Sequence, residues 1–281
     1  MKSGLSVPDY ARPQTLTEAL RLLAEGGWRL LAGGTDLYPA AGPRLAGAVL
    51  DLADLPELSG ITLGDGLRIG VTTPWATIAD ADLPAATRAL QQAARQVGGR
   101  QVQAAGTIGG NLCNASPAAD GVPPLLALEA EVELVSSFGK RRLALGDFLL
   151  GPRRTALRPD ELLAAVVIPA FALQGKSVFM KLVARSHLVI SIATVAARLV
   201  VKGDRVGHAS VAVGACSPVA TRLPAVEAAL AGVLVAEAVD RVADADVIAA
   251  LAAIDDVRAT GGYRGAAAAT LVRRAVAEAL A

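Results

Sequence analysis

Apolar residues in the first half of the chain follow two spacings, one typical of helices and one typical of strands. A helical spacing begins after Thr15, where Glu18 completes the pattern of a capping box, and Gly26-Gly27 ends it. A second helix is expected at residues 84–97, ended by Gly98-Gly99. Alternating or continuous apolar runs predict strands at residues 29–32, 48–52, 61–63, 67–71, 131–135, 141–145 and 162–168. Short antiparallel strands therefore coexist with helices.

The second half has a block of strands followed by a block of helices. A linker is expected at residues 170–176. Beyond it, the pattern predicts strands at residues 177–183, 190–201 and 206–214, and helices at residues 223–231, 235–242 and 265–281. In the first half, residues 101–124 are rich in Gly, Asn, Ser and Pro and predict an irregular loop, which at this length is functional or disordered. This order of elements favours an α+β fold over a doubly wound sheet.

Composition and charge exclude several classes of protein. An apolar fraction of 53 % in 281 residues excludes a disordered chain, and a net charge of +1 disfavours a nucleic-acid partner. The two cysteines, Cys113 and Cys216, cannot supply the four thiolates of an iron-sulfur cluster or a structural zinc site. The first ten residues lack the apolar stretch of a signal peptide, and residues 188–201 are too short to span a membrane. We therefore expect a cytoplasmic protein with no membrane span.

Two glycine-rich segments carry the strongest chemical signal. One is Ala32-Gly33-Gly34-Thr35-Asp36-Leu37, directly after the strand that includes Leu31, and the other is Gly106-Thr107-Ile108-Gly109-Gly110-Asn111. Glycine allows positive φ angles and a close approach of a ligand to the main chain. Neither segment contains Lys or Arg, so an anion such as a diphosphate would be held by backbone amides and by the Thr35 and Thr107 hydroxyls. The alternative is that each Gly-Gly pair only forms a turn.

The remaining candidates for chemistry are few. Neither glycine segment matches a Rossmann fingerprint or a P-loop. Asp120 either accepts hydrogen bonds from sugar or ribityl hydroxyls or caps the helix that follows. His187 and His208 lie in no nucleophile or metal motif, and Cys113 is expected to be a small buried residue rather than a redox-sensitive thiol. With no catalytic residue and no metal ligand, a bound cofactor is expected to do the chemistry.

In their order and separation, the two segments resemble the FAD-binding, or medium, subunit of the molybdenum hydroxylases, the family of xanthine dehydrogenase and carbon monoxide dehydrogenase. The resemblance covers nearly the whole chain. Besides the two glycine segments it rests on Ser116-Pro117 with Asp120, residues 179–185, residues 214–218, and residues 255–260 with Tyr263-Arg264.

The resemblance implies an FAD-binding domain of the vanillyl-alcohol-oxidase (PCMH) type with two lobes, at residues 1–172. A small α/β C-terminal domain with a three-stranded antiparallel sheet and helices follows at residues 177–281. By the same resemblance, non-covalent FAD would be bound by both glycine segments, by Asp120 at the flavin-side hydroxyls, by Leu163 at the ring system and by Lys181 at the flavin end. Ser186-His187 depart from the family pattern near the flavin.

The function implied by this resemblance is electron transfer within a complex. A large partner would carry molybdopterin and a small partner two-iron [2Fe-2S] clusters, and FAD on this chain would pass electrons to NAD, oxygen or a quinone. The assembly implied is a dimer of heterotrimers. Two alternatives remain: a self-contained FAD-dependent oxidase or dehydrogenase, and a non-enzymatic assembly module that has lost FAD.

Overall fold

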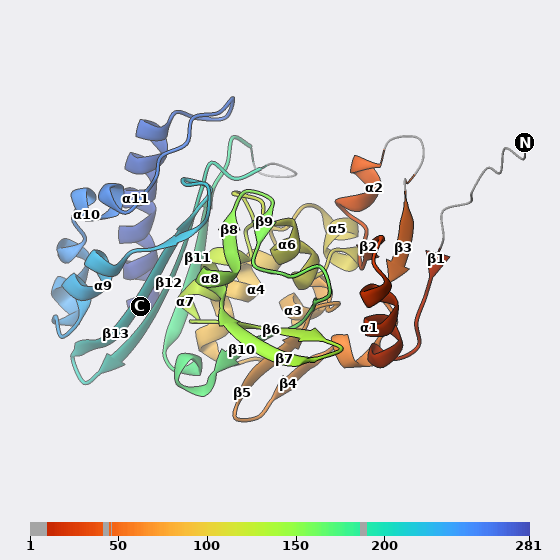
Figure 1. The fold of residues 1–281 in the computed structure, drawn as a ribbon. Coiled ribbons are helices and arrows are strands. Elements are labelled where there is room, and N and C mark those ends of the chain that lie inside the picture. The colour runs from red at the N-terminus through yellow and green to blue at the C-terminus, as the bar shows by residue number, and fades with distance from the viewer. Residues whose placement is uncertain (1–9, 42–44, 46, 186–189) are drawn as a thin grey trace, which may run out of the picture.

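The computed structural model of the chain describes residues 10–41, 45, 47–185 and 190–281. These residues form three sheets of three or more strands, which follow one another across the molecule from the N-terminal lobe to the C-terminal domain (Figure 1). His187 and the Ser186-His187 departure from the family pattern lie outside the described residues.

The N-terminal lobe is a small parallel sheet with two helices. Its strands run in the order β1-β3-β2, and its elements are β1 (Tyr10–Ala11), α1 (Leu16–Glu25), β2 (Trp28–Leu31), α2 (Leu37–Ala40) and β3 (Ala48–Asp51). The Thr15 hydroxyl accepts a hydrogen bond from the Glu18 amide, as the capping pattern predicts, and Gly26 ends α1 with a φ of 80°. The first glycine segment follows directly after the end of β2.

The second lobe is an antiparallel five-stranded sheet with helices. Its strand order is β4-β5-β10-β6-β7, with β4 (Ile61–Leu63), β5 (Gly66–Gly70), β6 (Glu131–Ser136), β7 (Gly139–Ala144) and β10 (Leu162–Pro169). The small hairpin of β8 (Leu149–Gly151) and β9 (Arg154–Thr155) lies apart from this sheet. The helices are α3 (Trp75–Asp80), α4 (Arg88–Ala94), α5 (Arg100–Ala105), α6 (Ile108–Asn114), α7 (Val122–Ala127) and α8 (Leu145–Phe148), with 3-10 turns at Pro56–Leu58, Ala85–Thr87 and Ala170–Leu173.

The prediction of an irregular loop at residues 101–124 is wrong, because this segment contains α5, α6 and α7. Glycine lowers helix propensity, but tertiary contacts override it here. A Cβ atom on Gly109 would lie 2.5 Å from the Cβ of Val71, so the glycine lets α6 approach the end of β5. The Pro123-Pro124 pair falls in the first turn of α7. Backbone N–H groups there make no hydrogen bond within the helix, so proline, which has no N–H, is tolerated.

The C-terminal domain is an antiparallel sheet covered by helices. Its strand order is β11-β12-β13-β14, with β11 (Lys176–Leu182), β12 (Ala193–Lys202), β13 (Arg205–Gly214) and β14 (Thr221–Arg222). The three predicted strands are present, and the two-residue β14 adds a fourth that is too short to give a pattern. The helices are α9 (Pro224–Leu230), α10 (Asp244–Ala249) and the long α11 (Gly261–Leu280). The predicted helix at residues 235–242 is a 3-10 helix (Val235–Arg241), and α10 has no counterpart in the prediction.

Each domain has its own hydrophobic core, and a small apolar cluster joins the two. Ala89, Ala93 and Ala127 of the second lobe meet Phe179 and Ala196 of the C-terminal sheet. Polar contacts support the same junction. Arg198, whose side chain is 1 % exposed, donates to the carbonyl oxygen of Ala127 at 2.9 Å and pairs with Glu129 at 2.6 Å. The domains therefore meet through a close-packed interface.

Candidate functional site

The first glycine loop, residues 32–37, leaves the C-terminal end of β2 and runs into α2. Gly34 has a φ of 69°, a left-handed conformation that favours glycine. Among the hydrogen bonds of the residues that the structure describes, none uses the backbone amides of residues 33–37 as donors. Partly buried N–H groups without a protein acceptor need one from solvent or from a ligand. This loop therefore presents a row of free donors.

The second glycine loop, residues 106–111, opens α6, and the amides of its residues 108–111 already have acceptors within the protein. The amides of Ile108 and Gly109 donate to the carbonyl oxygens of Thr73 and Val71 at 3.1 and 2.9 Å. The amides of Gly110 and Asn111 donate to the hydroxyl and carbonyl oxygens of Thr107 at 3.0 and 3.1 Å. Sequence reasoning treated both loops as equal sources of amides, but the structure shows that they differ.

The two loops touch each other through their glycines. A Cβ atom on Gly33 would lie 1.8 Å from the carbonyl oxygen of Ala105, just before the second loop. A Cβ atom on Gly106 would lie 2.7 Å from the carbonyl oxygen of Val102 and 3.3 Å from the hydroxyl oxygen of Thr35. These glycines are therefore required for contact between the loops. By contrast, the nearest atom to a Cβ on Gly110 is the Thr107 hydroxyl oxygen at 3.1 Å, and Gly110 is exposed.

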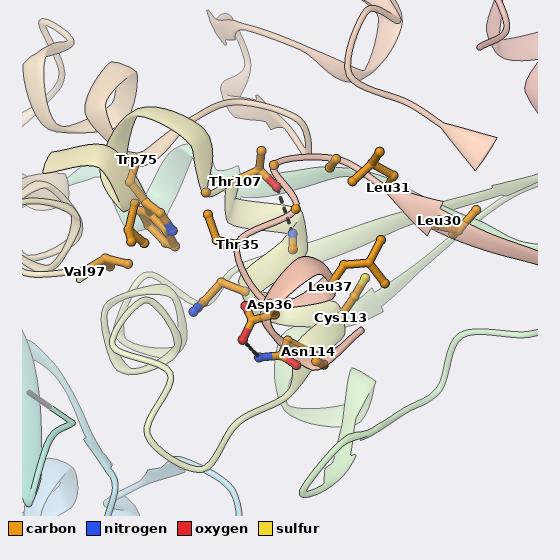
Figure 2. A pocket seen from close by; sticks show the side chains of 18 residues that line it. Leu30, Leu31, Thr35, Asp36, Leu37, Trp75, Val97, Thr107, Cys113 and Asn114 are labelled. Atoms are coloured by element: carbon orange, nitrogen blue, oxygen red, sulfur yellow. Dashed lines mark hydrogen bonds between the residues drawn. The ribbon is translucent and has the colours of Figure 1, made fainter. Parts of the chain in front are cut away.

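A cavity of about 410 Å³ lies between the loops, with Leu30 and Leu31 at one end and Trp75 and Val97 at the other (Figure 2). A second cavity, of about 430 Å³, adjoins it. The two share the lining residues Asp36, Val97, Val102, Asn111 and Asn114, so they form one groove. This groove extends from the first lobe to the edge of the C-terminal domain.

A buried ion pair closes the far end of the groove. The Lys181 ammonium lies 2.6 Å from a carboxylate oxygen of Asp120, and both side chains are less than 10 % exposed. Ser191 donates to the other carboxylate oxygen at 2.5 Å, and Lys181 also donates to the carbonyl oxygen of Gln96 at 3.2 Å. Burial raises the pKa of Asp120, while Lys181 and Ser191 oppose that rise. The polar ends of all three side chains are therefore held in fixed positions between the domains.

The structure brings together most of the residues predicted to bind the cofactor. Thirteen of them line the groove: Leu31, Ala32, Gly33, Gly34, Thr35, Asp36, Leu37, Gly106, Thr107, Gly110, Asn111, Asp120 and Lys181. Three do not. Ile108 is fully buried in the core, Gly109 packs against Val71, and Leu163 is 4 % exposed within β10.

Several groove residues were missed by the sequence analysis. Trp75 is 1 % exposed and packs in the core, and it also lines the first cavity. The prediction of a buried Cys113 is wrong, because the residue is exposed on the groove wall. Asn114 and Arg153 line the second cavity. Arg153 lies far from both loops in sequence, and no local pattern marks it.

The groove fits a dinucleotide with an anionic bridge. The free amides of the first loop can donate to phosphate oxygens, and the exposed backbone at Gly110 leaves space for a close approach. The side-chain oxygen of Asn111 is buried and has no hydrogen-bond partner among the described residues. Such an orphaned acceptor requires a donor from a ligand or water, and a sugar hydroxyl or an amino group would supply one.

The other candidates for chemistry take structural positions. His208 is half exposed on β13 and lies 3.2 Å from a carboxylate oxygen of Glu129. Cys216 is buried, which raises the pKa of its thiol to about 11. Within the described ranges, no group of three or more His, Cys, Asp or Glu side chains is placed to hold a metal ion.

Comparison with known families agrees with this geometry. Residues 4–171 match the FAD binding domain in molybdopterin dehydrogenase, and residues 178–279 match the CO dehydrogenase flavoprotein C-terminal domain. The chain belongs to this molybdopterin dehydrogenase FAD-binding family. It thus has an FAD-binding domain.

Relatives and solved structures cover 95 % or more of this family member. It is 33 % identical over 278 residues to the carbon monoxide dehydrogenase medium chain of Afipia carboxidovorans, with 95 % of each chain covered. It is 30 % identical over 276 residues to the nicotine 6-hydroxylase medium subunit of Paenarthrobacter nicotinovorans, with 96 % of each covered. Its structure matches a chain of reconstituted CO dehydrogenase from Oligotropha carboxidovorans with a TM-score of 0.90 at 31 % identity, covering 100 % and 99 % of the two chains.

The fold expected from the resemblance is confirmed: a two-lobed FAD-binding domain precedes a smaller C-terminal domain of sheet and helices. In the part of this FAD-binding family member that the structure describes, no helix combines the length and apolar character needed to cross a bilayer.

Proposed function

We propose that this chain is the FAD-carrying electron-transfer subunit of a molybdenum hydroxylase complex. The observation that carries the proposal is the groove itself: residues 33–37, whose amides donate to no described residue, line a cavity together with residues of the second loop. FAD, when bound, would supply the redox chemistry by taking up electrons and releasing them in pairs. The protein's residues bind and orient it.

The proposed placement follows the chemistry of each part of the groove. The diphosphate would accept hydrogen bonds from the amides of residues 33–37, with the Thr35 and Thr107 hydroxyls as further donors. The second loop would form the opposite wall at Gly110. Asp120 and Lys181 would bind the flavin end, where their ion pair with Ser191 fixes both side chains. The expected contact of Leu163 with the ring system has no support from the two cavities.

The partners proposed are a large molybdopterin subunit and a small subunit with two-iron [2Fe-2S] clusters, assembled as a dimer of heterotrimers. In support, several relatives are named as medium chains or medium subunits. Two cysteines are too few for a four-thiolate cluster on this chain. Electrons would enter from a partner's cluster and leave to NAD, oxygen or a quinone, within the cytoplasm. We propose domain limits at residues 1–172 and 177–281.

Purification of the chain from its native source tests this proposal. We expect a yellow-brown complex with one FAD per copy of this chain, a large molybdenum-containing subunit and a small iron-sulfur subunit. The organic substrate should reduce the flavin only in the complex. Reduction of the flavin by an organic substrate in the isolated chain would show a self-contained oxidase or dehydrogenase instead. A colourless chain that takes up no added FAD would show an assembly module.

A further inference from the structure

Arg153 reaches the groove from the turn between β8 and β9. Its backbone has a φ of 60°, a left-handed conformation that is uncommon for a residue other than glycine, asparagine or aspartate. Its amide donates to the carbonyl oxygen of Ala115 at 2.9 Å, at the end of α6. The turn is therefore fixed against the helix that follows the second glycine loop, and it directs an arginine to the wall of the second cavity.

The Arg153 side chain is linked to the first glycine loop through one residue. Its guanidinium donates to the backbone carbonyl oxygen of Asn114 at 3.2 Å and to the side-chain oxygen of the same residue. The side-chain amide of Asn114 in turn donates to a carboxylate oxygen of Asp36 at 2.9 Å (Figure 2). A continuous hydrogen-bonded chain thus joins three segments that are distant in sequence.

The charges along the groove indicate a role for the hydrogen bonds that link Arg153 to Asp36. Its lining contains two carboxylates, Asp36 and Asp120, and two cations, Lys181 and Arg153. Lys181 already pairs with Asp120. Asp36 lies in the first glycine loop, where an unbalanced negative charge would repel an incoming diphosphate. Among the described residues, no carboxylate lies within ion-pair distance of Arg153, so its positive charge is available to balance Asp36.

We propose that Arg153 is a positioning residue of the dinucleotide site. Through Asn114 it orients the Asp36 carboxylate and offsets its charge, so that the first glycine loop can accept the anionic diphosphate. This role rests on the proposed function, because it requires FAD in the groove. A purely structural role, in which Arg153 only attaches the β8–β9 turn to α6, makes different predictions.

Titration of FAD into the flavin-free full-length chain, followed by flavin fluorescence, separates the two roles. Arg153→Gly should weaken FAD binding about tenfold, the size expected for loss of one partly screened charge. Glycine suits the φ of 60° better than arginine, so the thermal midpoint of the flavin-free variant should stay the same or rise. Arg153→Lys, which keeps the charge, should recover most of the affinity. Arg154→Gln, which removes the neighbouring exposed charge, should bind FAD like the wild type.

The decisive variant combines Arg153→Gly with Asp36→Asn. Without the carboxylate there is no charge to balance, so the double variant should bind FAD within about twofold of Asp36→Asn alone. Wild-type affinity in Arg153→Gly, or an equal loss with and without the Asp36 carboxylate, would overturn the role of Arg153 and leave the proposed function intact. A wild-type chain that binds no FAD would overturn the proposed function, and this role with it. If Arg153→Gly does not fold, Arg153→Asn, which also removes the charge and suits the left-handed backbone, takes its place in both comparisons.

Discussion

The two glycine loops look alike in sequence but differ in the hydrogen bonding of their backbone amides. In the first loop, the amides of residues 33–37 donate to no described residue. In the second loop, the amides of residues 108–111 all donate to acceptors within the protein. The first loop leads only into α2, a helix of four residues. The second starts α6, whose first amides donate to Thr73 and Val71, just after β5, and to the Thr107 cap. One loop therefore offers donors, and the other offers a rigid wall.

This difference shows that a glycine pair alone does not indicate whether a loop can donate hydrogen bonds to a ligand or only forms a wall of its site. Gly33 and Gly106 are needed because the loops touch, and Gly109 is needed because α6 meets Val71. Among the glycines of the second loop, only Gly110 faces the groove with room for a ligand. The steric requirement must therefore be assigned to each glycine separately.

Breaking the Asp120–Lys181 ion pair, which lies outside both glycine loops, should have the largest effect on stability of the substitutions considered. It gives the upper value against which the effects of changes within the loops are compared. Asp120→Ala leaves the Lys181 ammonium buried without its carboxylate, which should lower the free energy of unfolding by about 4 kcal/mol. Asp120→Ala combined with Lys181→Met should recover most of that loss. Asp65→Ala, in an exposed turn, is the control, and urea unfolding is the measurement. Equal stability of the single and double variants would show that the pair is not coupled.

Gly33→Ala tests the contact between the loops. The added methyl group would overlap the carbonyl oxygen of Ala105, so the loops must separate, and we expect a loss of about 3 kcal/mol together with loss of bound FAD. Gly64→Ala, where the Cβ atom meets nothing within 4 Å, should change neither quantity. Wild-type stability and flavin content in Gly33→Ala would contradict the loop contact.

Gly110→Val tests whether the second loop acts as a wall of the FAD site. The branched side chain fits the protein with a small adjustment of Thr107 but occupies the groove, so FAD affinity should fall about 10- to 100-fold while the fold is kept. Gly262→Val is the matched control, because it also lies in the first turn of a helix and has space for a side chain. Flavin content by absorbance and far-ultraviolet circular dichroism separate the two effects. Undiminished flavin would refute the placement of FAD against Gly110.

Thr107→Val should have the smallest effect on stability, since the hydroxyl that it removes makes one contact within the protein, the cap of α6. The Gly110 amide would lose its acceptor, which should cost about 1 kcal/mol of stability. Thr107→Ser keeps the hydroxyl and should retain wild-type stability. If Thr107→Ser loses FAD while Thr107→Val keeps it, and both remain folded, the methyl group rather than the hydroxyl matters, and Thr107 is not a donor to the ligand.

Local patterns predicted much of the fold, and the errors share one cause. Strands such as β6, β10 and β12 were found because their apolar residues are continuous or alternate. The segment at residues 101–124 was predicted as a loop because its glycines and prolines oppose helix formation locally. The contacts of Gly109 with Val71 and of Gly121 with Trp75 show why small residues were needed in these helices and turns. No local pattern contains those partners.

The sequence by itself determined most of the order of elements, the family resemblance and the two glycine loops, because these depend on neighbouring residues and on motifs that stay intact in the chain. Only the tertiary structure decided which amides are free, which glycines face the ligand, and that Arg153 is linked to Asp36 through Asn114. A hydrogen bond already made, or a charge already balanced, depends on atoms that folding brings together from distant positions.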